Sequence, residues 1–121
     1  MNTVLIIEDD KAIVDVLKMI LEHDGFRIEK AFNGPTGIEK YKEVTPDIVL
    51  LDIRMPKMDG IEVLQEIRKF DRSAIIIMIS GHGNIETAVQ TTKLGAYDFI
   101  SKPFDVERLK LTIQNGLNYK K

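Results

Sequence analysis

The sequence predicts an α/β fold with a doubly wound parallel sheet, on the strength of two patterns. The first is a set of short aliphatic runs that are continuous rather than alternating, as expected of strands covered by helices on both faces. These runs are TVLII (3–7), DIVLL (47–51) and AIIIMIS (74–80). The second is the helical pattern that follows each strand, giving five strand–helix units. We take the strand order 2-1-3-4-5, which the alternation alone does not fix.

Two further segments complete the predicted sheet. FRIEKAF (26–32) is polar and alternating, which suits an edge strand, and YDFIS (97–101) is the fifth candidate. No repeat, low-complexity segment or internal linker interrupts the alternation, so we expect one domain over residues 1–121.

The first and last helices have the clearest apolar stripes. The first begins at Lys11 and ends at Asp24-Gly25, because glycine commonly follows the end of a helix. The last runs from about Phe104 to Leu117. Their expected buried faces are Ile13, Leu17, Ile20 and Leu21 in the first, and Val106, Leu109, Ile113 and Leu117 in the last.

The three middle helices are predicted from their start signals. Gly34-Pro35 opens the second, because proline suits a first helical position. Asp59 can cap the third, and Asn84 can cap the fourth. The stripe of the third helix consists of Ile61, Leu64 and Ile67.

The fourth helical segment, NIETAVQTTKLG (84–95), has a thinner stripe than the first helix. Ile85, Ala88 and Val89 are expected to anchor it, and its paired threonines are only modest helix formers. Few buried contacts imply a low free energy of local opening. We therefore expect this segment to move most readily.

Composition narrows the class of protein. The chain has 121 residues, 44% hydrophobic and 30% charged, with a net charge of −2, a globular balance without the basic excess that a nucleic-acid surface needs. The absence of cysteine excludes disulfides, thiolate zinc sites and thiol catalysis. No signal peptide and no apolar stretch of roughly 20 residues is visible, so we expect a cytoplasmic protein that does not enter membranes.

Acidic residues follow two of the predicted strands. Glu8, Asp9 and Asp10 follow the first and Asp52 ends the third, and these two strands are neighbours in the assumed order. Adjacent carboxylates repel one another unless a cation lies among them. Hard oxygen ligands that remain partly open to water suit Mg²⁺. The alternative, solvated loop acids, is favoured for Asp52 taken alone but not for the whole cluster.

Ser80 and Lys102 follow the fourth and fifth strands at the same edge. Taken singly, each has an ordinary explanation, a strand-end hydroxyl and a surface lysine. Together with the acids, they could receive a phosphoryl group. Asp52 would be the nucleophile, Mg²⁺ would neutralise charge, and the hydroxyl and ammonium would contact the phosphoryl oxygens.

Four motifs occur in a diagnostic order: LIIEDD, DIVLLDIRMPKMDG, ISG and GAYDFISKPF. On these motifs the sequence resembles the receiver domains of two-component response regulators, over essentially the whole chain. The resemblance implies a flavodoxin-like (βα)5 fold. It also implies a phosphorylation-activated signalling switch rather than a turnover enzyme, with a sensor histidine kinase as phosphodonor and the receiver catalysing its own phosphotransfer and dephosphorylation.

The resemblance assigns a role to each acidic residue. Asp52 is the phosphoacceptor and a metal ligand, and Asp9 is the direct ligand of Mg²⁺, with Mn²⁺ as the alternative. Glu8 contacts the metal through water, and Asp10 is a flanking acid. The backbone carbonyl of Arg54 completes the protein ligands.

The resemblance also assigns the residues that respond to phosphate. Ser80 matches the switch hydroxyl, Lys102 the phosphate-binding lysine and Phe99 the aromatic switch position, here without a tyrosine hydroxyl. The Lys102–Pro103 peptide bond is expected to be cis. His82 lies two residues after Ser80, where it could affect access of the attacking water, although an exposed loop histidine is more often plain polar surface.

GHGNIETAV and LGAYDFISKPF resemble, more particularly, the receivers of nitrogen-regulatory (NtrC-like) transcription activators. Those carry an ATPase domain and a DNA-binding domain after the receiver. The chain is then either a stand-alone regulator or, as we prefer, a receiver cut from a longer transcription regulator. A homodimer or an adjoining domain is expected to use the face formed by the fourth helix, fifth strand and fifth helix.

The site residues argue against three other functions. A phosphatase of the haloacid-dehalogenase type needs a second aspartate two residues after the nucleophile, where this chain has Arg54. A flavodoxin-like cofactor binder needs a polar, glycine-rich phosphate loop after the first strand, where this chain has acids. A degenerate receiver, acting only as an interaction module, usually lacks a site residue, and none is missing here.

Overall fold

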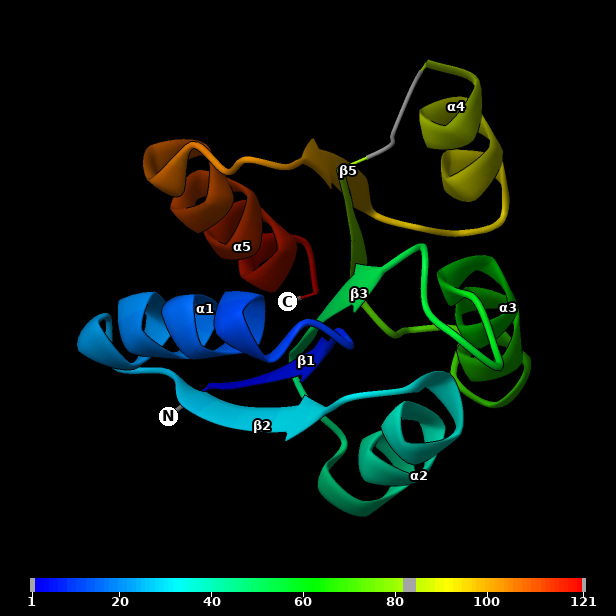
Figure 1. The fold of residues 1–121 in the computed structure, drawn as a ribbon, viewed down its shortest axis with the longest axis horizontal. Helices are drawn as coiled ribbons and strands as arrows, with labels where there is room; N and C mark the ends of the chain where they lie inside the picture. The colour runs from blue at the N-terminus through cyan, green and yellow to red at the C-terminus, as the bar shows by residue number, and fades with distance from the viewer. Residues whose placement is uncertain (1, 82–84, 121) are drawn as a thin grey trace.

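Strands and helices alternate along the whole chain, as predicted (Figure 1). The computed structural model describes residues 2–81 and 85–120. In order, the elements are β1 (Thr3–Ile7), α1 (Lys11–His23), β2 (Arg27–Ala31), α2 (Gly34–Val44), β3 (Ile48–Asp52), α3 (Gly60–Phe70), β4 (Ile76–Ser80), α4 (Ile85–Lys93), β5 (Asp98–Ser101) and α5 (Val106–Lys120). Each strand begins within two residues of its predicted start, and the third extends through Asp52.

The sheet is parallel throughout, and its strand order is β2-β1-β3-β4-β5. The assumed order is therefore confirmed. In the register of β1 against β3, Ile7 pairs with Leu51. The residues that follow this pair, Glu8 and Asp52, consequently leave the sheet at the same edge. This edge is the switch point of a doubly wound sheet, where such folds place their ligand sites.

Helices cover both faces of the sheet (Figure 1), which explains why the strands are apolar on both sides. Val4 and Ile6 of β1 pack in one cluster with buried residues of α1 and α5. Leu5 and Ile7 face the opposite way and pack with residues of α2 and α3. In the described part of the chain, no helix is long and apolar enough to cross a membrane.

Side chains at the helix starts explain where the helices begin. Asp10 caps α1, accepting hydrogen bonds from the backbone N–H groups of Ala12 and Ile13. Asn33 caps α2 one residue before the predicted glycine–proline start, and Asp59 caps α3 as predicted. The predicted cap of α4, Asn84, lies outside the described residues.

The helical stripes of α1, α3 and α5 are largely confirmed, with two shifts. Val14 and Val63, which were not among the predicted stripe residues, are fully buried in α1 and α3. In α5, Leu109, Ile113 and Leu117 are buried, whereas Val106 at the helix start is exposed. The helix begins after Phe104 because the Asp105 side chain accepts hydrogen bonds from the N–H groups of the first turn.

The expected anchors of α4 were wrong. Ile85 is 83% exposed and Val89 is 47% exposed, while Ala88 is half-buried. The fully buried side chain of this helix is Thr91, whose hydroxyl donates to the backbone carbonyls of Thr87 (3.0 Å) and Ala88 (3.1 Å). Periodicity identifies residues that share a face, but packing against the sheet decides which face is inside.

Candidate functional site

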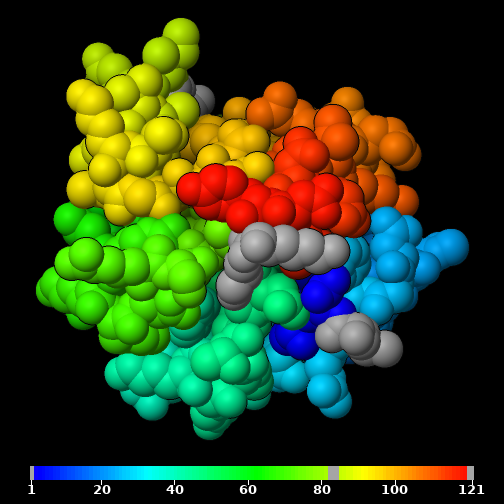
Figure 2. Space-filling view, turned by 180° about the vertical axis from the view of Figure 1, so that it is seen from behind, coloured from blue at the N-terminus to red at the C-terminus, as the bar shows by residue number. Residues whose placement is uncertain are grey.

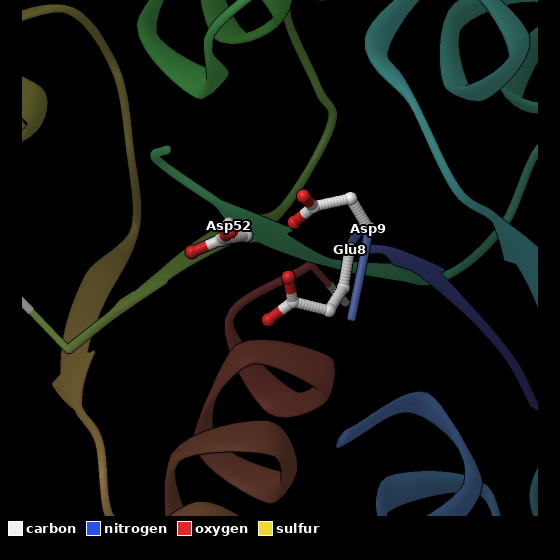
Figure 3. A group of neighbouring side chains, drawn as sticks. All are labelled: Glu8, Asp9 and Asp52. Carbon is white, nitrogen blue, oxygen red and sulfur yellow. The ribbon is translucent and has the colours of Figure 1, made fainter. Parts of the chain in front are cut away.

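Three carboxylates converge where β1 and β3 end (Figure 3). Glu8 and Asp9 come from the residues after β1, and Asp52 is the last residue of β3. One ligand oxygen from each lies within 4.8 Å of the others. Glu8 is 1% exposed and Asp52 is 4% exposed, while Asp9 is open to solvent. The sequence prediction that these acids share one edge is confirmed.

Lys102 supplies positive charge to this cluster from the loop after β5. Its Nζ donates to Glu8 Oε1 and lies 3.4 Å from Asp52 Oδ1. Burial alone would lower the pKa of Lys102, but its contacts with the two carboxylates outweigh burial and raise the pKa. The ammonium therefore stays charged, and it compensates part of the negative charge that the strands bring together.

One lysine does not neutralise the whole cluster. Burial raises the pKa of Glu8, and the neighbouring Asp52 carboxylate raises it further, against the opposing effect of Lys102. Partial desolvation and the adjacent Glu8 carboxylate likewise raise the pKa of the more exposed Asp9. Both carboxylates thus lose stability as anions in the folded protein, which is the condition under which a bound cation is favourable.

The carboxylates line an open pocket together with Asp10, Arg54, Gly81 and Lys102. Arg54, whose backbone carbonyl the resemblance assigns to the metal, thus lies at the pocket. The flanking acid Asp10 also lines the pocket, but its side chain caps α1. Sequence reasoning missed this cap, although an aspartate directly before a helical stripe is the usual signal for one.

Ser80 and Phe99 lie near the pocket but are not among its lining residues. Ser80 is buried at the end of β4, one residue beyond Ile79, which pairs with Asp52. Phe99 pairs with Met78 on β5 and is half-buried against the α2–α3 side of the sheet. The Lys102–Pro103 peptide bond is cis. His82 lies outside the described residues.

Gly60 supports the site without taking part in its chemistry. Its N–H donates to the carbonyl of Ile53 (2.7 Å), which brings the start of α3 against the end of β3. A Cβ at this position would lie 2.1 Å from the backbone carbonyl oxygen of Asp52, closer than any real contact. Sequence reasoning identified Asp59 as a helix cap and missed the role of the glycine that follows it.

Residues 4–114 match the response regulator receiver domain family. The chain belongs to this family. Regulatory protein AtoC of Escherichia coli (strain K12) is 37% identical over 116 residues, which are 96% of this chain and 25% of AtoC. The chemotaxis protein CheY of Bacillus subtilis (strain 168) is 42% identical over 118 residues, which are 97% of this chain and 98% of CheY.

Solved structures agree with this family. A receiver domain from Clostridium thermocellum superposes with a TM-score of 0.94 at 31% identity, over 99% of this chain and 97% of that one. The receiver domain of NtrX from Brucella abortus gives a TM-score of 0.90 at 38% identity, over 95% and 98% of the two chains. AtoC, ZraR and NtrX are NtrC-like proteins, so the more particular resemblance is also confirmed.

The relatives differ in length, and this difference limits what they imply. The chain spans about a quarter of the length of AtoC and of ZraR, but nearly all of CheY. Membership of the family makes this chain a receiver of a two-component system, a class of phosphoacceptor switches rather than turnover enzymes. Membership of this family rules out the haloacid-dehalogenase-type phosphatase and the flavodoxin-like cofactor binder as alternatives.

Proposed function

We propose that this receiver is switched by phosphorylation of Asp52, with a sensor histidine kinase as the donor. The observation that carries the proposal is the buried Asp52 carboxylate at the switch point, with Glu8 and Asp9 beside it and Lys102 Nζ at 3.4 Å. An oxygen of Asp52 forms the new P–O bond as the P–N bond of the phosphohistidine breaks. The electron pair of the broken P–N bond stays on the imidazole nitrogen.

The residues at the pocket fit Mg²⁺, and Mn²⁺ would use the same donors. The set consists of hard oxygens: Asp9 as direct ligand, Glu8 through water, Asp52, and the backbone carbonyl of Arg54. Bound there, the metal supplies charge neutralisation for the carboxylates and the phosphoryl oxygens. The raised pKa values of Glu8 and Asp9 support this assignment, because the two anions are desolvated and crowded and lack sufficient positive charge.

Lys102 and Ser80 are the residues of this chain that would read the phosphorylated state. The ammonium of Lys102 already lies against Asp52, so a phosphoryl group there gives it a more highly charged partner. The Ser80 hydroxyl, at the end of the adjacent strand, is drawn to a phosphoryl oxygen, and the Phe99 ring turns inward. The resting and switched conformations differ in how strongly they bind the phosphoryl group, and this difference drives the change.

The output that we propose is transcription, through an ATPase and DNA-binding region of the kind expected for NtrC-like regulators. The location that we propose for the protein is the cytoplasm. Residues 1–121 would form the receiver domain of such a regulator. Its α4–β5–α5 face would dock a second receiver or the adjoining domain. The exposed apolar side chains of Ile85 and Val89 on α4 support this surface.

Phosphorylation with a small phosphodonor tests the proposal. Incubation with acetyl phosphate and Mg²⁺ should add one phosphoryl group, detected by intact mass, and Asp52→Asn should abolish it. Asp15→Asn is the matched control, because Asp15 is an exposed aspartate on the outside of α1. Undiminished labelling of Asp52→Asn would refute the assignment, and loss of labelling in the control would mean that the assay reports something other than the site.

Lys102→Ala separates labelling from response. The variant should still accept the phosphoryl group from the small donor, since Asp52 and the metal ligands remain. It should lose most of the spectral change that follows, because the contact that reports the phosphate is gone. Spectra that change as much as in the wild type would exclude Lys102 as the coupling residue.

A further inference from the structure

The two ends of α4 are held very differently. At the start of the helix, Ile85 is 83% exposed, and Val89 in the middle of the helix is about half exposed. Toward its end, Thr91 is fully buried, and the N–H of Ala96 donates to the Thr91 carbonyl (2.9 Å). In Figures 1 and 2, α4 projects from one corner of the molecule, beside α3. The burial pattern therefore attaches α4 mainly through its C-terminal end.

A single side chain from α3 secures that end. The guanidinium of Arg68 donates to the Gly95 carbonyl, just after α4, through Nε (3.0 Å) and Nη2 (2.6 Å). Nη2 also donates to the carbonyl of Ala74, before β4, and Nη1 donates to the carbonyls of Arg72 (3.0 Å) and Asp71 (3.4 Å). One planar, charged group thus joins the end of α3, the approach to β4 and the α4–β5 turn.

The α4–β5 turn is shaped to receive this arginine. Gly95 has φ of +108°, a conformation that residues with a side chain rarely adopt. A Cβ at Gly95 would also lie 2.6 Å from Arg68 Nε. Two residues later, the N–H of Tyr97 donates to the carbonyl of Ile76 (2.7 Å), which joins the approach to β5 to β4. The point that Arg68 holds is therefore fixed to the sheet as well.

We propose that Arg68 is the fixed pivot of α4, so that this helix opens from its N-terminal end and swings about the Gly95 carbonyl. The start of α4 then moves while the register of β5 against β4 is retained. The pivot exists in the unphosphorylated protein. A swing driven by phosphorylation rests on the proposed function, whereas the pivot itself does not.

Hydrogen exchange of the unphosphorylated chain tests the pivot. In the wild type, the amides of residues 94–97 should exchange about tenfold more slowly than those of 89 and 90, because the latter need only local opening of the free end. Arg68→Met keeps a long, unbranched apolar stem at this position but removes every guanidinium contact. It should accelerate exchange at 94–97 by about tenfold and so remove the gradient.

Two variants serve as comparisons. Lys69→Met removes the neighbouring cation, whose Nζ pairs with Glu66 on the exposed side of α3, and should leave the gradient intact. Arg68→Lys keeps the charge but cannot reach three segments at once, so it should lose most of the protection. Exchange in β1 and β3 reports global unfolding in each sample, and Arg68→Lys decides the question if Arg68→Met does not fold. Unchanged protection at 94–97 in folded Arg68 variants would overturn the pivot.

Beryllofluoride with Mg²⁺ distinguishes the pivot from the switch. In the wild type, the phosphoryl mimic should change exchange at 89 and 90 and leave 94–97 protected, while in Arg68→Met the change should extend through 94–97. An equally large wild-type change at 94–97 would overturn the pivot. Absence of any response in the wild type would contradict the proposed switch, and the resting gradient would still decide the pivot.

Discussion

Two helices beside the site, α1 and α4, differ in how they are held. The 13-residue α1 is capped by Asp10 and buries Val14, Leu17 and Leu21. The nine-residue α4 buries Thr91 and exposes Ile85. α1 follows directly on the acids after β1, whereas α4 comes after Ser80, the proposed switch hydroxyl at the end of β4. The acidic side of the site, where we propose metal binding, is thus built on a well-anchored element, and the side where we propose the response is built on a weakly anchored one.

This difference indicates how one domain can combine a fixed site with a movable surface. Ligands need carboxylates held in place, which a helix with a continuous buried stripe provides. A conformational response needs an element whose local opening costs little free energy. The two requirements fall on helices on opposite faces of the sheet, so the response need not disturb the ligands (Figure 1).

The largest effect should come from truncating the buried stripe of α1. Leu17→Ala should lower the free energy of unfolding by about 3 kcal/mol, because it leaves a cavity in place of a fully buried side chain. Val89→Ala in α4 should lower it by less than about 0.5 kcal/mol, because about half of the valine is already exposed to solvent. Urea denaturation measures both, and similar losses would mean that the two helices are equally anchored.

Removing the cap of α1 should have an intermediate effect. Asp10→Ala should cost about 1 kcal/mol, since the N–H groups of Ala12 and Ile13 lose their acceptor. Asp15→Ala on the same helix is the control and should be nearly neutral. Equal effects of the two substitutions in urea denaturation would mean that the cap adds nothing to the anchoring of α1.

Asp9→Asn separates the charge of the site from the packing of α1. The native pKa of Asp9 is raised above 3.8, so the folded state binds its proton more tightly than the unfolded state does. The ionised carboxylate therefore costs stability above the raised pKa, and this cost disappears as the pH falls toward 3.8. Without divalent cations at pH 7, Asp9→Asn should gain about 0.5 kcal/mol, discounted for solvent screening.

Thermal unfolding at several pH values, with and without Mg²⁺, checks this prediction. The gain of Asp9→Asn should shrink as the pH is lowered. Saturating Mg²⁺ should stabilise the wild type more than the variant, because it binds the folded carboxylates. A loss of stability in Asp9→Asn at pH 7 without metal would contradict the account of crowded anions.

Ile85→Ser should have the smallest effect on stability. The side chain is almost fully exposed, so the free energy of unfolding should change by less than about 0.5 kcal/mol. The same variant should weaken any self-association that beryllofluoride induces, measured by sedimentation velocity. A large stability loss would show that Ile85 anchors α4 after all.

Much of the fold and the core of the site followed from local sequence signals. Continuous aliphatic runs reflect burial on both faces of the sheet. The acids after the first and third strands had to meet, because the assumed strand order makes these two parallel strands neighbours. The orientation of α4 did not follow, because periodicity does not reveal whether Val89 or Thr91 faces the sheet. The role of Arg68 was also hidden, since its partners are backbone carbonyls, and every residue carries one.

Gly60 has a consequence for how such a site tolerates change. No side chain fits between the start of α3 and the Asp52 carbonyl, so substitution at position 60 displaces the backbone that carries the proposed phosphoacceptor. Gly60, which has no functional group, is therefore as constrained as Asp52, whose backbone it contacts. In a comprehensive substitution screen, loss of signalling at position 60 would reflect misplacement of a chemically intact carboxylate, and its signature would be a folded protein that is phosphorylated slowly.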